Sequence, residues 1–396
     1  MIMRYYIKCL TCSTSHTLRI SIGHNPKQLH SFKCVNCAEM IKVSLDIDFT
    51  TLKIDINCDE NSYISTQEGT IINLHPELAI SSSNINRDLY FPMEDLFKSF
   101  DINSMANENP NVKHFDAFWA LGGNHLLTEE WAELKRAWSL SLNSKTDLSN
   151  KIIRTFFNQK GVKNTPTIRE WKHGFSQKLI SPYFLQFYNS AKSFIDKIKR
   201  NFSDEFEKFS TFYKDNWRLI HVEKCFNIYC EYFSNFSEYS QVILFDKNNI
   251  PIPNDSKVTS NAFETVKLFY GNAYEVYTTN IETIACLNNI YKGREFRQFE
   301  SMNLSKYNKI NKAKRTNPFS STVELKHFEQ CLDSSLRNAS HHGAMQFDRD
   351  TDEIKYQSGG TGAERTIQYC EYLSKCNKII FSLALLMMLE LLYWGE

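Results

Sequence analysis

Apolar and polar residues alternate along the first 50 positions, in stretches such as YYIKC, HTLRISI and IKVSLDIDF. A period of two is typical of short strands that bury one face. Similar patterns continue after residue 50, in TLKIDIN and GTIINL, and end in the polar stretch SSSNIN. We therefore predict a small β structure over residues 1–50, followed by a β extension and linker over residues 51–87.

The pattern becomes helical from about residue 88, where apolar residues recur every three or four positions. The segment TEEWAELKRAWSLSL is the clearest example, and several further helices follow it. The proline-containing segment DKNNIPIPNDSKVTS then breaks the periodicity. We place a boundary there, between a helical middle domain over residues 88–257 and a last domain over residues 258–396. The chain is thus expected to be mainly α, with a helical bundle at its C-terminus.

The first half of the last domain should contain two helices. One runs from about Asn261 to Tyr291, and Gly293 suits its C-terminal cap. The sequence Ser321-x-x-Glu324 is a capping box, which predicts the start of the second helix. Its buried stripe should consist of apolar residues at helical spacing: Leu325, Phe328, Leu332 and Leu336.

An apolar helix closes the chain, spanning about 16 residues from Ile379 and containing Ser382 and Glu390. A helix that crosses a bilayer needs about 20 apolar residues. We therefore favour a buried core or dimer-interface helix over membrane insertion. The N-terminal residues MIMRYYIKCLTC lack the apolar core of a signal peptide, so we expect a cytoplasmic protein without membrane contact.

Four of the 11 cysteines have the spacing of a metal site. Cys9-x-x-Cys12 and Cys34-x-x-Cys37 lie between the predicted strands and are separated by 21 residues. Two such pairs supply the four thiolates of a tetrahedral zinc site. We predict a zinc-ribbon-like module in which Zn²⁺ is structural, because four protein ligands leave no open coordination position. Its surface could serve nucleic acid or protein, and the spacing does not decide between them.

Near the C-terminus, Arg337, Asn338 and His342 form an Arg-Asn-x-x-x-His string at the end of the second predicted helix, before Gly343. This string resembles the signature of the HEPN superfamily, whose nuclease members carry Arg-x(4–6)-His, often with Asn after the Arg. The likeness covers residues 258–396, since an acidic turn, a short extended segment and a closing apolar helix also follow the string.

The resemblance implies a metal-independent endoribonuclease. Arg337 would bind phosphate oxygens, Asn338 would hold the phosphate or the imidazole, and His342 would transfer protons. His341 is an alternative base, and Asp333, one turn before Arg337, could orient the guanidinium. Attack by the ribose 2′-OH would leave a 2′,3′-cyclic phosphate and a 5′-hydroxyl.

The resemblance also implies a homodimer formed through the C-terminal domain, with the closing helix and its neighbours as the dimer surface. Such architectures often act as toxins or as antiviral defence effectors in abortive infection, and the middle domain suits binding of a regulatory protein partner. The alternative is a non-catalytic HEPN-like module for dimerisation or nucleic-acid binding, with the zinc ribbon as an adaptor.

The formal net charge of +1 at pH 7 excludes a uniformly basic surface, so affinity for RNA must come from local segments. Residues 292–315 carry eight Lys or Arg against two Glu, with aromatic residues interleaved. This composition suits a track for single-stranded RNA, or else a solvated loop. The candidate RNA-binding residues are Lys306, Lys309, Lys312, Lys314 and Arg315.

Overall fold

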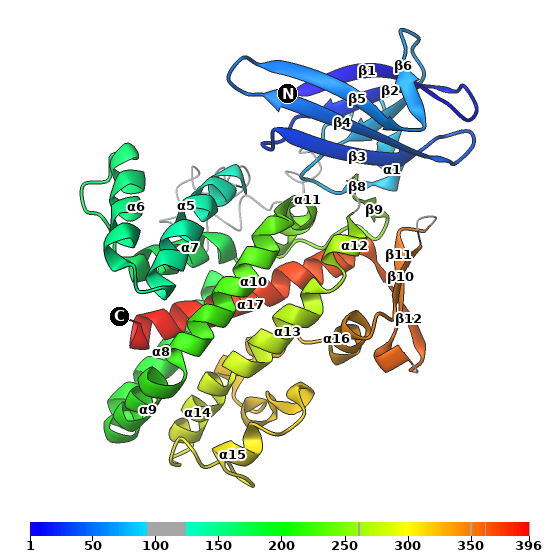
Figure 1. Cartoon of the computed structure of the whole chain (residues 1–396). Coiled ribbons are helices and arrows are strands. Elements are labelled where there is room, and N and C mark those ends of the chain that lie inside the picture. The colour runs from blue at the N-terminus through cyan, green and yellow to red at the C-terminus, as the bar shows by residue number, and fades with distance from the viewer. Residues whose placement is uncertain (93–123, 260–261, 349–350, 361, 396) are drawn as a thin grey trace.

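The computed structural model describes the chain except for residues 93–123, 260–261, 349–350, 361 and 396. A β module at the N-terminus sits beside a larger helical unit (Figure 1). The structure is therefore mainly α, as predicted. The start of the predicted middle domain lies partly in residues 93–123, outside the described residues.

The β module contains two sheets, with strand orders β6-β1-β2-β7 and β3-β4-β5. Strand β2 pairs antiparallel with β1 and parallel with β7, so the strands predicted as an extension belong to the same sheets. Alternating side chains such as Ile7, Leu18 and Leu45 are buried between the sheets. The strands are β1 Ile2–Cys9, β2 Ser15–Ser21, β3 Lys27–Lys33, β4 Met40–Asp48, β5 Lys53–Glu60, β6 Ser62–Ile64 and β7 Thr70–Leu74.

The helical unit is built on local signals that the sequence carries. At the start of α7, for example, Thr167 accepts a hydrogen bond from the backbone of Glu170 while the Glu170 side chain accepts one in return, a capping box. The main helices are α5 Asn124–Leu142, α6 Thr146–Gln159, α7 Ile168–Ile180, α8 Leu185–Asn201, α9 Ser203–Asn216, α10 Arg218–Ser234, α11 Phe236–Lys247, α13 Phe269–Asn280, α14 Glu282–Tyr291, α16 Ser334–His341 and α17 Tyr369–Trp394.

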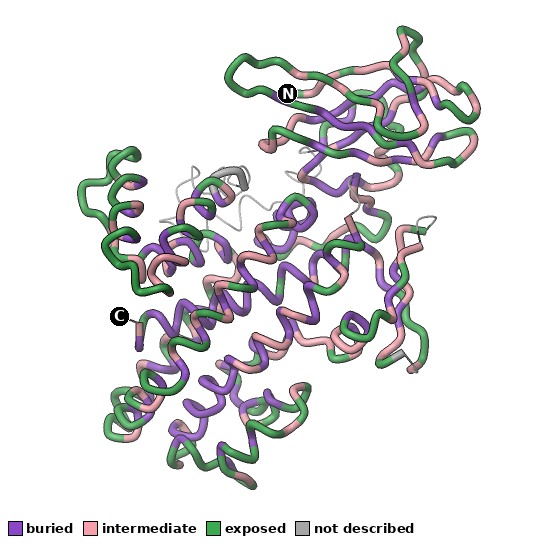
Figure 2. The backbone as a smooth tube through the Cα atoms, viewed as in Figure 1, coloured by how far each residue is buried: buried purple, intermediate pink, exposed green. Residues whose placement is uncertain are grey.

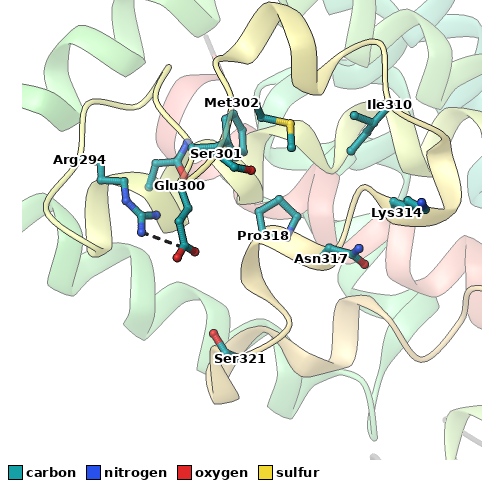
Figure 3. A pocket seen from close by; sticks show the side chains of 11 residues that line it. Arg294, Glu300, Ser301, Met302, Ile310, Lys314, Asn317, Pro318 and Ser321 are labelled. Atoms are coloured by element: carbon teal, nitrogen blue, oxygen red, sulfur yellow. Dashed lines mark ion pairs between the residues drawn. The ribbon is translucent and has the colours of Figure 1, made fainter.

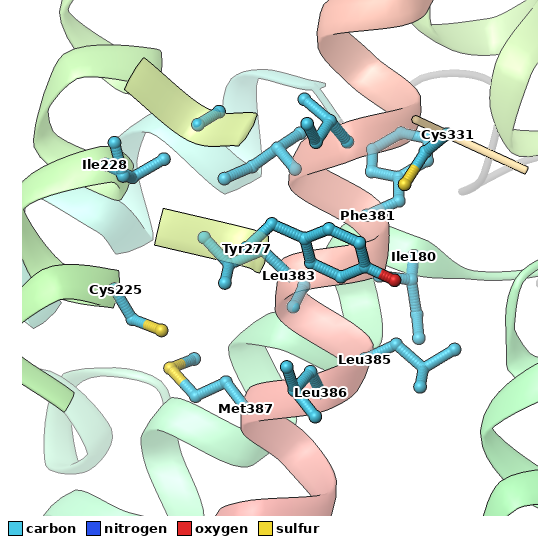
Figure 4. Packing of buried hydrophobic residues seen from close by; sticks show 14 of the residues in the cluster. Ile180, Cys225, Ile228, Tyr277, Cys331, Phe381, Leu383, Leu385, Leu386 and Met387 are labelled. Carbon is cyan, nitrogen blue, oxygen red and sulfur yellow. The ribbon is translucent and has the colours of Figure 1, made fainter. Parts of the chain in front are cut away.

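Helix α17 forms the centre of the helical unit. It packs against α7, α8, α10, α11 and α13, and Figure 2 shows buried positions concentrated along these central helices. Figure 4 shows Tyr277 of α13 lying across its side chains. Helix α17 is long and apolar enough to cross a membrane, but 83% of its apolar window is buried within the chain. The prediction of a buried core helix is confirmed, and α17 offers little surface for the dimer that was expected to use it.

One continuous hydrophobic core extends from Leu78 to Trp394. The predicted boundary between residues 257 and 258 therefore falls inside a single packed unit. The short strands β8 Ile80–Ser81 and β9 Ser256–Lys257 pair with each other and connect this unit to the β module.

Two predicted helices of the last domain differ from the structure. The helix expected over 261–291 is divided into α12 Phe263–Val266, α13 and α14. The helix expected from Ser321 does not form as one element: Val323–Phe328 is a 3-10 helix, and α16 begins separately. Asp333 causes this break, since its carboxylate accepts hydrogen bonds from Ser335 and Leu336 and starts a new helix.

Candidate functional site

Helix α16 carries the Arg-Asn-x-x-x-His string at its C-terminal end. The helix ends at His341, His342 is its C-cap residue, and Gly343 adopts the left-handed φ of +65°. Only glycine adopts this conformation without steric cost, which explains why the helix stops there, as predicted. A three-stranded antiparallel sheet follows: β10 Met345–Asp348, β11 Glu353–Gln357 and β12 Glu364–Gln368.

The Arg337 guanidinium is held by a carboxylate of the neighbouring helix α13. Its Nε donates to Glu275 Oε1 at 2.6 Å, and its Nη2 forms an ion pair with the same oxygen. Its Nη1 donates to Asn338 Oδ1 at 2.7 Å. The orienting role predicted for Asp333 is therefore taken by Glu275, because the Asp333 carboxylate is occupied in capping the helix.

Sequence reasoning missed Glu275, although one signal pointed to it. Glu275 is the only charged residue in the segment FYGNAYEVYTTN that forms α13. A lone carboxylate on a helix that is otherwise packed in the core usually has a buried or half-buried partner. No rule of sequence spacing identifies that partner, because 62 residues separate Glu275 from Arg337.

The same carboxylate binds a second cation. Lys312 Nζ lies 2.5 Å from Glu275 Oε2 and also donates to the backbone oxygen of Glu275 at 3.0 Å. Burial alone would raise the pKa of Glu275, but the hydrogen bonds from Lys312 and Arg337 outweigh it and lower that pKa. Burial also lowers the pKa of Lys312. Two cations and one anion therefore leave the cluster Glu275–Lys312–Arg337 with a net positive charge.

Asn338 links the cluster to the segment that follows the helix. Its Nδ2 donates to Ser358 Oγ at 3.2 Å, while its Oδ1 accepts from Arg337. The amide is thus fixed at both ends, and it fixes the guanidinium in turn. Ser358, in the short 3-10 helix Ser358–Gly360, was also missed from the sequence.

Both histidines at the end of α16 are exposed. His341 lies against α13 at Gly271, where a Cβ atom would come within 3.0 Å of the imidazole. His342 donates its backbone N–H to Asn338 O at 3.1 Å. The two imidazoles therefore lie at the end of the helix that carries the guanidinium. Because both are exposed, burial does not decide which of them would act as the base.

The basic segment 292–315 folds back onto the helical unit. Its aromatic side chains Phe296, Phe299 and Tyr307 are buried, so they do not form an exposed stacking track. Arg315 is also buried, and its guanidinium donates to backbone oxygens of residues 278 and 308. Of the five basic candidates, Lys312 reaches Arg337 through Glu275, while Lys306, Lys309 and Lys314 are exposed.

The four predicted cysteine ligands come together in the β module. Their sulfur atoms lie within 4.8 Å of one another. The Sγ–Sγ distance is 3.7 Å for Cys9 and Cys37, and 3.5 Å for Cys12 and Cys34. A tetrahedral shell with metal–sulfur distances of about 2.3 Å separates its sulfurs by about 3.8 Å. The geometry therefore fits a structural metal ion.

The two cysteine loops have the same backbone turn. Ser13 N donates to Cys9 O at 2.9 Å, and Ala38 N donates to Cys34 O at 3.0 Å. Both Ser13 and Ala38 have a φ near +60°. This repeated turn brings the two thiols of each Cys-x-x-Cys pair together. The packing of the two sheets then places the two pairs side by side.

Polar groups around the sulfurs suit thiolate ligands. The Thr14 hydroxyl lies 3.2 Å from Cys12 Sγ and helps to lower the pKa of Cys12 to about 5. The buried ring of His16 places Nε2 3.3 Å from Cys34 Sγ, a distance that suits an N–H···S hydrogen bond. Groups that contact the ligand atoms in this way orient them and reduce their charge. The cysteine spacing alone did not reveal His16.

Comparison of the chain with known protein families, with curated proteins and with solved structures finds no match. The chemistry of both sites therefore rests on the residues described above.

Proposed function

We propose that the chain is a metal-independent endoribonuclease with its active site at the end of α16. The observation that carries this proposal is that Glu275 and Asn338 hold the Arg337 guanidinium on a helix whose end carries two exposed histidines. A guanidinium binds phosphate oxygens and an imidazole transfers protons near neutral pH, which together suffice to cut RNA.

In the proposed reaction, His342 removes the proton from a ribose 2′-OH and O2′ attacks the adjacent phosphorus. The bond between phosphorus and O5′ breaks, and O5′ takes a proton from a second imidazole. That group is His341 or a histidine of a second copy of the chain. The products are a 2′,3′-cyclic phosphate and a 5′-hydroxyl end.

Arg337 stabilises the charge that develops on the phosphate in the transition state. Lys312 adds a second positive charge at the same place, because both cations share the Glu275 carboxylate. Fixed charges of this kind stabilise a transition state without needing to reorganise. Lys312 acts through its charge alone, because its three N–H groups already donate to Glu275 and Thr279. Asn338 keeps the guanidinium in position through its Oδ1.

The metal of the β module is Zn²⁺ in this proposal, and its role is structural. Four thiolates are the ligand set that structural zinc prefers, and they leave no position for a substrate. The module would then bind RNA or a partner protein. RNA cleavage by a homodimer, in the manner of a toxin or an antiviral defence effector, is the biological role that the HEPN-like string suggests.

One observation favours a second candidate, a non-catalytic module. The Arg337 guanidinium already donates to Glu275 and Asn338, which leaves few free N–H groups for a phosphate. In this alternative the cluster joins α13 to α16, and the C-terminal domain serves for dimerisation or nucleic-acid binding.

An assay of cleavage of labelled single-stranded RNA and tRNA, with EDTA present, distinguishes the ribonuclease from the non-catalytic module. Wild type should cut, while Arg337→Ala and His342→Ala should lose roughly 10² to 10⁴ of the rate. Lys326→Ala is the matched control, since it removes an exposed charge outside the basic segment and outside the proposed site. A wild-type protein that binds RNA and leaves it intact would support the non-catalytic module.

A further inference from the structure

The cavity beside the basic segment does not gather its charged groups around one ligand. It measures about 360 Å³, and Figure 3 shows Arg294 and Lys314 on opposite sides of it. Arg294 also faces Glu300, at 4.0 Å. A small-ligand site usually has a few polar groups that converge on one point. The open edge of a sheet in the β module carries a more specific pattern.

Strand β5 forms a free edge of the sheet β3-β4-β5. It pairs with β4, and no other strand of the described residues pairs with it. Strand β3, at the opposite edge, lies toward the helical unit, where Ser31 N donates to Thr259 O at 2.5 Å. Strand β5 therefore lies on the side of the sheet away from the helical unit (Figure 1). Alternate backbone N–H and C=O groups of an edge strand are unpaired, and they form a template for a further strand.

The side chains of β5 divide into a polar row and an apolar row. The apolar row consists of Ile54, Ile56 and Cys58, which are half-buried and pack against the core of the β module. Proteins commonly block an open edge with proline or with a charge in the inward-facing row, and this row contains neither. A further strand at this edge would complete the burial of the three side chains.

The polar row is exposed, and it is complementary to itself in one antiparallel register. When the two-fold axis of a pair of copies passes through Ile56, Lys53 of each copy lies opposite Asp59 of the other. Asp55 then lies opposite the neutral amide of Asn57. Opposite charges on directly opposed residues stabilise a strand pair, and like charges destabilise it. This register therefore contains two favourable charge pairs and no directly opposed like charges.

The neighbouring registers lack this complementarity. A shift of two residues in one direction places Asp55 opposite its own copy, and a shift in the other direction places Asp55 opposite Asp59. A shift of one residue places the apolar row of one copy opposite the polar row of the other. In the favoured register the apolar rows meet, with Ile54 of each copy opposite Cys58 of the other. Charge and burial therefore select the same register.

We propose that β5 is a self-association edge, where a second copy of this chain adds its own β5 in antiparallel orientation. The two three-stranded sheets then form one continuous sheet. The shared edge is short, because a bulge opposite Lys42 and Val43 ends the regular part of β5. We therefore expect weak association, at roughly 10–100 μM. The surface is separate from the C-terminal domain, and the proposal does not rest on ribonuclease activity.

A charge-swap series on the full chain tests the register, by sedimentation over a range of concentrations. Lys53→Asp and Asp59→Lys each place like charges opposite one another, and each should weaken the association roughly tenfold. The double variant Lys53→Asp/Asp59→Lys reverses both charges and should restore most of the affinity. Lys27→Asp makes the same change in β3, at the opposite edge of the sheet, and should leave the affinity unchanged.

A disulfide reports the register independently of affinity. In zinc-loaded Ile54→Cys, mild oxidation with diamide should join the new thiol to Cys58 of the second copy, which mass spectrometry of the linked peptides detects. Within one copy the two positions lie about 13 Å apart along the strand, too far for a disulfide. Adding Cys58→Ser should abolish the crosslink.

Three results would overturn the proposal. Association that the single charge swaps leave unchanged would belong to another surface, such as the C-terminal domain. A double variant no tighter than the single variants, or no crosslink between positions 54 and 58, would exclude this register. No association up to about 1 mM would leave the edge to a partner other than a second copy. None of these measurements involves RNA, so they are independent of the presence or absence of cleavage.

Discussion

At the scale of single residues, one carboxylate determines how the site is arranged. Glu275 holds Arg337 and Lys312, which come from segments 25 residues apart along the chain and from different elements. Arg337 and Asn338 were singled out because the string that they begin resembles the HEPN signature. Glu275 and Lys312 meet Arg337 only after three segments pack together, and no local pattern encodes that meeting.

Glu275→Gln should lower the rate of RNA cleavage by roughly tenfold to hundredfold, since a neutral amide no longer fixes the guanidinium. The matched control is Glu264→Gln, which removes an exposed carboxylate of the neighbouring helix α12. That carboxylate pairs with Lys267 and does not contact Arg337. Rates on a labelled RNA at saturating and limiting concentrations check this. A faster Glu275→Gln enzyme would mean that Glu275 restrains Arg337 from its substrate.

At the scale of elements, the contact between α13 and α16 depends on a glycine. A Cβ at Gly271 would lie 2.9 Å from Ser340 Oγ and 3.0 Å from the His341 imidazole. The Ser340 hydroxyl cannot move freely, because it donates to Lys267 O at 2.7 Å. A helix that carries the proposed catalytic groups is thus seated closely on its neighbour.

Gly271→Ala should therefore lower the free energy of unfolding by about 1 kcal/mol, because overpacking outweighs the gain in helix propensity. Gly174→Ala is the control in helix α7, where an added Cβ meets nothing within 4 Å. That variant should gain up to about 1 kcal/mol. Urea denaturation of both variants measures the change in the free energy of unfolding, which should be a decrease for Gly271→Ala and an increase for Gly174→Ala. A stabilised Gly271→Ala protein would contradict the close contact between α13 and α16.

The element scale also shows where sequence patterns succeed and fail. The existence of the apolar helix α17 and of the cysteine loops was predicted correctly, because periodicity and ligand spacing are local signals. Helix α17 is longer than predicted, since it begins at Tyr369 and not at Ile379. The helix predicted from Ser321 failed because the capping tendency of Asp333 competes with the apolar stripe, and the stripe is buried without one continuous helix. The shared core across residue 257 could not be foreseen, since proline marks a turn and not the end of a packed unit.

At the scale of the whole molecule, the helical unit contains a buried charged triad. His221 of α10 lies 2.8 Å from Glu390 of α17 and 3.4 Å from Glu282 of α14, and all three are nearly inaccessible. Burial opposes the charge on His221, but the two carboxylates outweigh it and raise its pKa to about 9. The triad therefore connects three central helices through the two N–H groups of one imidazolium.

The stability that His221 contributes should be complete below pH 6.5 and should be lost as pH rises through about 9. A pKa change of this size corresponds to about 3 kcal/mol. The buried Lys172 and Lys247, whose pKa burial lowers to about 8, act in the opposite direction. The measurement is therefore the difference in unfolding free energy between wild type and His221→Gln from pH 6 to 10. A difference that does not shrink with rising pH would contradict the triad.

The β module and the helical unit have separate hydrophobic cores, so loss of the metal should affect them differently. Cys34→Ser should abolish stoichiometric zinc binding and expose the amides of the β module to hydrogen exchange. The helical unit should keep its protection, because its core contains no metal ligand. Cys58→Ser, a free cysteine of β5 outside the cluster, should bind zinc normally. Loss of protection in both parts would show that they fold as one unit.

The proposed ribonuclease is tested most directly by a pair of substrates. Wild-type protein in EDTA is given a labelled RNA strand and the same strand with 2′-deoxyribose at its cleavage position. The account predicts cleavage of the RNA to a 2′,3′-cyclic phosphate and no cut at the 2′-deoxy position. Cleavage of both strands, or cleavage that requires an added metal ion, would contradict it.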